Sequence, residues 1–257
     1  ARIGYEAGTL SKEELRSCED SAIRDLVAKE KACGLHVITD GEFRRATWHL
    51  DFMWQLGGID HQKTKSGLPF HGEAAMIDDT FLTGKITAAS HHSFVDHFLF
   101  TNSLTDKDSV AKQTIPAPAQ TFAQFAMPFS LDNTRKYYKT DQDLIDDIAE
   151  AYHIFIDELY KAGCRNLQLD DCTWPMTVDA SALKLWDTDE AGLKEVREKL
   201  LEANNLVLSG LPSDLTVNTH ICRGNFHSSY ACSGPYDDVA DYVLARENVH
   251  AFFLEFD

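Results

Sequence analysis

The sequence lacks the marks of several common classes of protein. No apolar run is long enough to cross a bilayer, and the amino-terminal residues do not follow the basic-then-apolar pattern of a signal peptide. A glycine-rich phosphate-binding fingerprint and a Gly-x-Ser-x-Gly motif are both absent. A cytoplasmic protein is therefore expected, and a dinucleotide-binding fold and a serine hydrolase are disfavoured.

Positive charge is scarce in this chain. The 257 residues include 24 lysines and arginines against 41 aspartates and glutamates, which gives a formal net charge of −17. Nucleic acids and anionic membranes select basic surfaces, so neither is expected as a partner. The acidic residues are spread over predicted helix faces such as 141–150 and 190–202, which indicates a role in solubility. Nothing in the charge pattern indicates the oligomeric state.

The six cysteines show no regular spacing and no Cys-x-x-Cys pair. Free thiols are therefore expected, and a cysteine with a special role is expected to be a ligand or a nucleophile. Cys18 and Cys33 fall on the apolar stripe of a predicted helix and are expected in the core.

One order of elements recurs four times: a helix, a short apolar strand, and polar residues directly after the strand. The first helix begins at a capping box at Ser11 and ends at Gly34. The four predicted helices span 11–33, 141–163, 190–208 and 237–245, and the strands that follow them span 35–39, 166–169, 215–217 and a segment ending at residue 255.

This order predicts an α/β fold of the TIM-type (β/α)8 barrel class, in which the loops after the strands build the active site. Two further strands are predicted at 85–89 and 113–117, with a helix at 93–104 between them. Six strands are two short of a barrel, so we expect one catalytic barrel domain over 1–257, truncated at both ends, with the first and last strands missing. A doubly wound open sheet is the alternative. The aromatic-rich segment 46–82 (Trp48, Phe52, Trp54, Phe70) is expected to form a structured excursion over the mouth of the cleft.

A histidine and a cysteine two positions apart form the first candidate site. His220 and Cys222 follow a short apolar run, and residues i and i+2 of an extended segment point to the same side. Nitrogen and thiolate ligands together favour zinc. Glu255, at the end of the next strand, would supply a third ligand at a common point. The alternatives are a strand-end histidine with a buried free cysteine, and a solvated carboxylate at Glu255.

Two more carboxylates end predicted strands. Glu42 and Asp170 would project into the same cleft of a barrel, where they could hold a substrate ammonium group or move protons. The alternative for each is a helix cap or a loop charge, a capping role that Asp171 could also fill. Arg44 and Arg45 either bind a substrate carboxylate or pair with nearby acids, and the sequence does not separate these readings.

Four ordered motifs carry a family resemblance. Thr-Asp-Gly-Glu-Phe-Arg-Arg at 39–45, Leu-Gln-Leu-Asp-Asp at 167–171, Val-Asn-Thr-His-Ile-Cys at 217–222 and Phe-Leu-Glu at 253–255 resemble the catalytic carboxyl-terminal barrel of the cobalamin-independent methionine synthase family. The resemblance covers essentially the whole chain. It implies that His220, Cys222 and Glu255 bind zinc and that Glu42 and Asp170 bind the amino group of homocysteine.

The resemblance also implies an activity and small-molecule partners. The expected reaction is zinc-dependent methyl transfer to the thiol of homocysteine, with methionine as product and methyl-folate as one candidate donor. The chain departs from the family pattern in several places: it ends before the family's fourth ligand, a cysteine, it has Asp171-Cys172 in place of Glu-Pro, and it has no tryptophan at 120–125. The alternatives are an alkyltransferase for another thiol, of the epoxide to coenzyme M type, and a non-catalytic barrel that binds a thiol or a metal.

Overall fold

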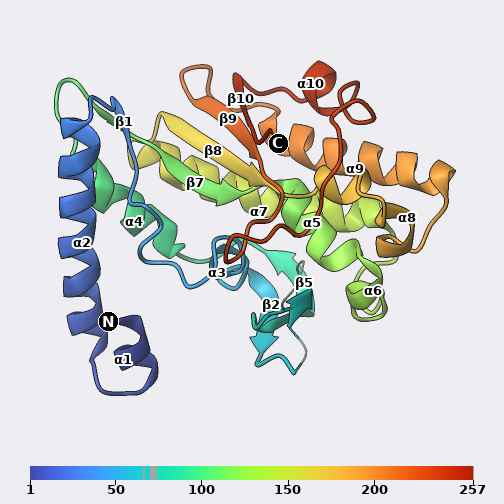
Figure 1. Ribbon diagram of the computed structural model, residues 1–257, viewed down its shortest axis with the longest axis horizontal. Helices are drawn as coiled ribbons and strands as arrows, with labels where there is room; N and C mark the ends of the chain where they lie inside the picture. Colours follow the sequence, from blue (N-terminus) through green and yellow to red (C-terminus); the bar gives the residue numbers. More distant parts are fainter. Residues whose placement is uncertain (66, 70–73, 257) are drawn as a thin grey trace.

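Parallel strands form the centre of the fold in the computed structural model, which describes residues 1–65, 67–69 and 74–256 (Figure 1). Strands β7, β8, β9 and β10 pair in that order, and β1 pairs with β6, which only Lys112 separates from β7. The strands span β1 (Val37–Ile38), β6 (Val110–Ala111), β7 (Gln113–Pro116), β8 (Asn166–Asp171), β9 (Thr216–Ile221) and β10 (Ala251–Leu254).

The order of these strands distinguishes the two predicted architectures. In both parallel sheets, β1–β6 and β7–β8–β9–β10, paired strands follow the order of the chain and every pair is parallel. A doubly wound sheet reverses its strand order at a switch point, whereas a barrel does not. The predicted TIM-type barrel is confirmed.

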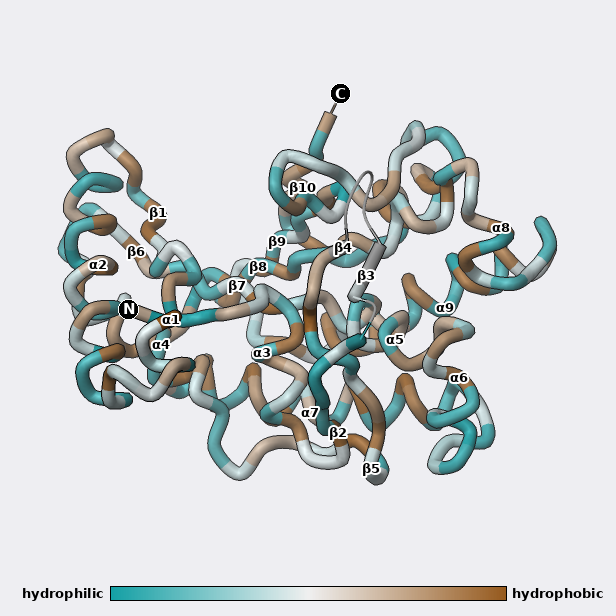
Figure 2. Tube along the Cα trace, turned by 60° about the horizontal axis from the view of Figure 1, so that its bottom comes forward, coloured by the Kyte–Doolittle hydropathy of each residue, from teal (hydrophilic) through white to brown (hydrophobic). Residues whose placement is uncertain are grey.

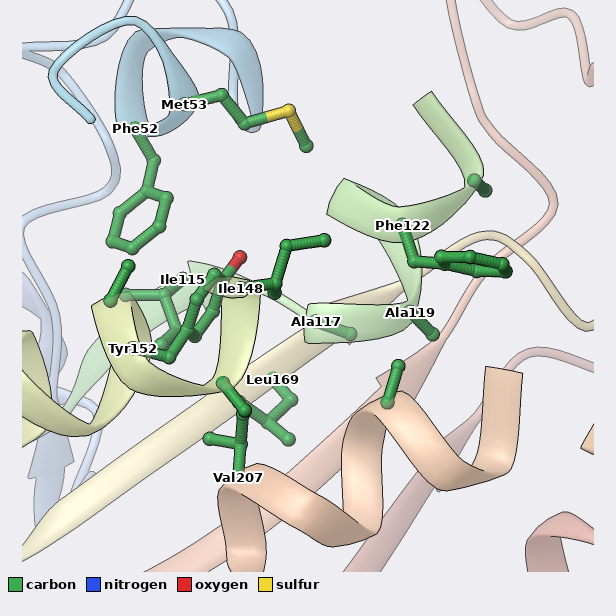
Figure 3. Packing of buried hydrophobic residues seen from close by; sticks show 14 of the residues in the cluster. Phe52, Met53, Ile115, Ala117, Ala119, Phe122, Ile148, Tyr152, Leu169 and Val207 are labelled. Carbon is green, nitrogen blue, oxygen red and sulfur yellow. The ribbon is translucent and has the colours of Figure 1, made fainter. Parts of the chain in front are cut away.

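The outer face of the sheet packs on α5 (Pro118–Ala126), α7 (Asp141–Lys161) and α9 (Glu190–Leu208) (Figure 3). Alternate strand residues such as Leu167 and Leu169 are fully buried there, because successive side chains of a strand point to opposite faces. The intervening residues, including Gln168 and Asp170, face the inside of the barrel. The helices thus bury one face, and the other is left for polar side chains.

Helix α2 (Lys12–Ala32) begins at the predicted capping box. Ser11 Oγ accepts a hydrogen bond from the backbone nitrogen of Glu14, and a carboxylate oxygen of Glu14 accepts one from the backbone nitrogen of Ser11, at 3.2 and 2.8 Å. The helix lies at one side of the molecule, next to β1 (Figure 1 and Figure 2).

The prediction that Cys18 and Cys33 lie in the core is wrong, because both are exposed. Helix α2 buries only a narrow stripe, Leu15, Ile23 and Val27. Cys18 lies beside this stripe and Cys33 follows the last turn, so the apolar periodicity overstated the width of the buried face.

The prediction of a barrel strand at 85–89 is also wrong. Those residues continue β5 (Asp79–Thr87), which pairs antiparallel with β2 (Gly57–Gln62) and packs on α7 and on α6 (Pro128–Thr134). An apolar strand pattern shows that a segment is extended but not which strand it joins. The chain here first builds a hairpin, whose described tip pairs β3 (Leu68–Pro69) with β4 (Ala74–Ala75).

The hairpin belongs to the predicted structured excursion over 46–82. Phe52 is fully buried in the main core, and Trp54 Nε1 donates a hydrogen bond to Thr80 Oγ1 at 2.9 Å. Phe70 lies outside the described residues. The base of the excursion packs on the helical layer through β5.

Helix α4 (Ser93–Asn102) matches the predicted 93–104, and His92 caps it by accepting a hydrogen bond from the backbone nitrogen of Phe94 at 3.2 Å. The predicted helix 237–245 is mostly turns, which begin where the backbone nitrogens of Val239 and Ala240 both donate to the carbonyl of Tyr236. The remaining helices are α1 (Arg2–Glu6), α3 (Leu50–Met53), the 3-10 helix Pro175–Thr177, α8 (Ala182–Leu185) and α10 (Val243–Arg246). Across the described segments, no helix combines the length and the apolar character that a membrane span requires.

A buried polar cluster lies on the helical side of the sheet. Asn204 Nδ2 donates to Asp171 Oδ2 at 3.1 Å and to Glu247 Oε1 at 3.4 Å, and Asn204 Oδ1 accepts from the backbone nitrogen of Ala119 at 2.8 Å. Burial raises the pKa of Glu247 to about 8 and raises that of Asp171 as well. Glu247 is therefore protonated in the folded protein at neutral pH.

We expect Glu247→Gln to weaken the pH dependence of stability. The pKa of Glu247 is about 8 when folded against a usual 4.5, so the folded state holds an extra proton between these values. Its contribution to stability is present below pH 4.5 and is lost as the pH rises through 8. Urea unfolding across this range should show wild-type stability falling more steeply with pH than that of the variant. Exposed Glu195→Gln is the control, and equal slopes for Glu247→Gln and wild type would contradict the assignment.

Candidate active site

Strand β9 carries the His-x-Cys motif into the inside of the barrel. His220 pairs in register with Asp170 of β8 and with Phe253 of β10, and Cys222 follows directly after the strand. His220 Nδ1 lies 3.0 Å from the carbonyl oxygen of Phe253. Because a carbonyl can only accept, Nδ1 carries the hydrogen and the other ring nitrogen is free to face Cys222.

His220 and Cys222 form a charged pair. The hydrogen bond with Cys222 raises the pKa of His220 to about 9. A hydrogen bond from Cys172, followed by the one from His220, lowers the pKa of Cys222 far below the usual value for a thiol. An imidazolium beside a thiolate is thus favoured near neutral pH, and a thiolate is the form that acts as nucleophile or metal ligand.

Cys172 is a site residue that sequence reasoning missed. Its Sγ lies 2.8 Å from Cys222 Sγ, and its side chain is buried. The signal was present in the sequence, since Cys172 comes directly after β8 just as Cys222 comes directly after β9. Two adjacent parallel strands therefore each end in a cysteine at the same level.

Glu255 follows β10, the strand beside β9, as predicted. Its Oε2 accepts hydrogen bonds from the backbone nitrogen of Arg223 at 2.9 Å and from Asn225 Nδ2 at 3.0 Å. Glu255 also lines an open pocket of 680 Å³. The other residues of this pocket are His220, Asn225, Phe252, Phe253, Leu254 and Phe256. The carboxylate is thus near the His-x-Cys strand but engaged with the chain that follows it.

The fit of zinc to these residues is partial. His220 and Cys222 place a nitrogen and a sulfur donor side by side, which is the ligand chemistry that zinc prefers. Within the residues that the structure describes, however, no three histidine, cysteine, aspartate or glutamate side chains are arranged to hold a metal ion. The assignment of His220, Cys222 and Glu255 as zinc ligands therefore stays a prediction.

Glu42 is held at the mouth of the barrel by two neighbours. Thr114 Oγ1 donates to Glu42 Oε1 at 2.7 Å, and a guanidinium nitrogen of Arg45 lies 2.9 Å from the same oxygen. The backbone of Glu42 has a positive φ of 57°, and its nitrogen donates to Asp40 Oδ1 at 2.8 Å. The turn after β1 thus places the Glu42 carboxylate at the end of the strand, where the sequence predicted it.

The two arginines after Glu42 pair with acids of the chain itself. Arg45 is buried and binds Glu42 together with the backbone and hydroxyl oxygens of Thr114. Arg44 binds Glu19 and Asp20 of α2. Of the two readings left open by the sequence, the structure supports pairing with nearby acids.

Asp170 lies on the inner face of β8 and is 8% exposed. Its pKa is raised to about 7, chiefly by burial and also by the charge of Glu42, while the hydrogen bond from Gln168 and the charge of His220 act to lower it. Gln168 Nε2 donates to Asp170 Oδ1 at 2.7 Å, and Lys112 Nζ donates to Gln168 Oε1 at 3.0 Å. Glu42, Asp170 and His220 are thus close enough to influence one another.

Lys112 and Gln168 were also missed by sequence reasoning. Gln168 lies within the predicted strand 166–169 and Lys112 directly precedes the predicted strand 113–117, both at alternate, inward-facing positions, and this periodicity was the available signal. Asp171, by contrast, points to the helical side and accepts hydrogen bonds from the backbone nitrogen and hydroxyl of Thr173. The helix-capping role suggested for Asp171 is wrong, because the 3-10 helix that follows begins after Trp174 and has no side-chain cap.

The fold and the site together define a TIM-type barrel with its polar side chains gathered at the carboxyl ends of the strands. A search against protein-family models finds no match. A solved structure from Listeria monocytogenes, described as a putative vitamin-B12 independent methionine synthase, shares 31% sequence identity with a TM-score of 0.74, and the match covers 100% of this chain and 67% of that one. The chain belongs to the cobalamin-independent methionine synthase family.

Two curated relatives are also similar to this chain. The uncharacterized protein YxjG of Bacillus subtilis (strain 168) is 35% identical over 258 residues, which cover 100% of this chain and 66% of the relative. A methionine synthase of Saccharolobus solfataricus is 25% identical over 230 residues, which cover 86% of this chain and 57% of the relative. The chain thus spans less than two thirds of the length of either protein.

Proposed function

We propose that this protein transfers a methyl group to the thiol of homocysteine to form methionine, without cobalamin. One observation carries the proposal: two carboxylates and a His–Cys pair lie at the carboxyl ends of neighbouring barrel strands and influence one another's ionisation. Membership of the methionine synthase family supports the same reaction class.

The carboxylates suit the amino-acid end of the substrate. Glu42 and Asp170 face the cleft, and an ammonium group there would gain charge-assisted hydrogen bonds to them. Arg45 and Thr114 fix one oxygen of Glu42, which orients the other. An ammonium bound beside Asp170 would also favour the ionised form of that carboxyl group.

The His–Cys pair suits the sulfur end of the substrate. We propose that His220 and Cys222 hold zinc, with Glu255 as a third ligand after its side chain leaves Arg223 and Asn225. Zinc bound there would supply a positive charge that keeps a substrate thiol ionised near neutral pH. Glu42 and Asp170 would hold the amino end of homocysteine while His220 and Cys222 hold the sulfur end, which positions the thiol for reaction. The methyl donor, with methyl-folate as a candidate, would approach from the open pocket.

Methyl transfer to homocysteine, measured with several methyl donors and zinc-loaded protein, tests the proposal. Wild type should form methionine, and Glu42→Gln should raise the KM for homocysteine by about 10-fold or more, because a hydrogen bond to a charged group is worth about 1.5–3 kcal/mol. The exposed Glu195→Gln is a matched control and should behave as wild type. No methionine with any donor would overturn the proposed function.

A further inference from the structure

We propose that Cys172 and Cys222 are a modification site, a pair of thiols that closes into a reversible disulfide. Their sulfur atoms lie 2.8 Å apart in the reduced structure. The other four cysteines are not part of this pair. Cys18 and Cys33 are exposed, and Cys164 and Cys232 are buried.

The backbone already holds the two cysteines at a separation that a disulfide can span. Asp171 pairs with Ile221 in the parallel ladder, and the backbone nitrogen of Cys222 donates to the carbonyl of Asp171 at 3.3 Å. Cys172 and Cys222 are therefore the next pair along two neighbouring strands. Such strands lie about 4.8 Å apart, and disulfides join Cα atoms about 4.4–6.8 Å apart. Closing the bond needs side-chain rotation and no separation of the strands.

Hydrogen bonds fix both ends of the pair. The backbone nitrogen of Cys172 donates to Gln120 Oε1 at 3.3 Å, and the backbone nitrogen of Gly224 donates to Cys222 Sγ at 3.4 Å. A pair held in place loses less conformational freedom when the bond forms than two cysteines on mobile segments would. The two thiols are thus pre-arranged for reaction with each other.

The disulfide forms in two steps, and the exposure of the two cysteines decides which of them reacts first. Cys222 is partly exposed whereas Cys172 is buried, so a small disulfide such as oxidised glutathione reaches Cys222 first. The Cys222 thiolate attacks one sulfur of the small disulfide, forms a mixed disulfide and releases one small thiol. Cys172 then attacks Cys222 Sγ and releases the second. Two protein thiols are oxidised, one small disulfide is reduced, and the two protons leave with the two small thiols.

The consequence for activity rests on the proposed function, whereas the disulfide does not. A bond to Cys172 removes the Cys222 sulfur from its hydrogen bond with His220. If Cys222 serves methyl transfer as proposed, the oxidised protein is inactive until a reductant reopens the bond.

Peptide mapping without reduction tests the disulfide. Wild type, Cys172→Ser and Cys232→Ser are incubated with oxidised glutathione and a metal chelator, and free thiols are then alkylated. Trypsin places Cys172 in peptide 166–184, Cys222 in 200–223 and Cys232 in 224–246, so each can be read separately. Wild type and Cys232→Ser should show 166–184 joined to 200–223, and dithiothreitol should separate them. In Cys172→Ser, peptide 200–223 should instead retain one glutathione.

Two outcomes would overturn the proposal. In the first, Cys222 of the wild type keeps glutathione as it does in Cys172→Ser. In the second, Cys172 and Cys222 are both recovered alkylated under conditions that modify the exposed Cys18 and Cys33. The wild-type map decides the question even where Cys172→Ser fails to fold. Because the map needs no turnover, a joined pair in a protein that forms no methionine would count against the proposed function alone.

Discussion

Cys222→Ser is expected to lower the rate of methyl transfer to homocysteine by more than about 100-fold, because partners one shell further from a metal already cost about 10–100-fold when removed. The Cys222 thiol shares a hydrogen bond with His220 that favours the thiolate. A serine hydroxyl does not ionise near neutral pH, so it replaces neither the charge nor the sulfur donor. Steady-state rates measure the loss of activity, and the zinc content per protein molecule measures the loss of the sulfur ligand.

Cys232→Ser is the matched control for this substitution. Cys232 is also buried, but burial raises its pKa to about 11, so its thiol stays protonated at neutral pH. The control should keep the wild-type rate and zinc content. A Cys222→Ser protein with full activity would remove Cys222 from the site, and normal zinc with a lost rate would show that the thiol acts without binding the metal.

The barrel strands were predictable because each ends a recurring pattern. Apolar runs at 35–39, 113–117, 166–169 and 215–217 correspond to β1, β7, β8 and β9, and the run before Glu255 corresponds to β10. In each case a helix precedes a short run that is buried on one face, and polar residues follow it. The carboxyl edge of a parallel sheet therefore gathers residues that are far apart in the sequence, such as Glu42, Asp170 and His220.

The misses share one physical cause. Periodicity reports that a face is apolar, but not what covers it or which strand lies alongside. Residues 85–89 were predicted as a barrel strand, yet 85–87 belong to β5, which pairs with β2 of the inserted hairpin. Cys18 lay near a helical stripe, yet α2 has too little neighbouring structure to bury it.

The candidate site shows the same limit at the level of side chains. Strand ends located Glu42, Asp170, His220, Cys222 and Glu255, but the contacts between side chains depend on register. Cys172 meets Cys222 only because β8 and β9 pair without a shift through Asp171 and Ile221. The hydrogen bonds that hold Glu255 to Arg223 and Asn225 likewise depend on the turn after β9.

Asn204→Ala is expected to destabilise the fold by about 3 kcal/mol, since a buried polar group left without its partner costs about 1–3 kcal/mol. Asn204 is fully buried and joins three elements through its amide. Alanine would remove the hydrogen bonds to Asp171 behind the active-site strand, to Glu247 after α10, and from the backbone nitrogen of Ala119 at the start of α5. The destabilisation should appear as a lower urea midpoint with an unchanged m-value.

The neighbouring Asn205→Ala is the matched control for Asn204→Ala. The side chain of Asn205 makes two hydrogen bonds, to the carbonyl of Arg246 and from the backbone nitrogen of Asn248, and both are exposed to water. Water replaces the lost partner there, so the cost should stay within about 1 kcal/mol. Equal costs for the two variants would show that the amide of Asn204 is not what ties β8, α5 and the segment after α10 together. A larger loss of unfolding free energy for Asn204→Ala, in a variant that stays folded below its urea midpoint, would show that the buried cluster on the helical side of the sheet stabilises the strands that carry the candidate site.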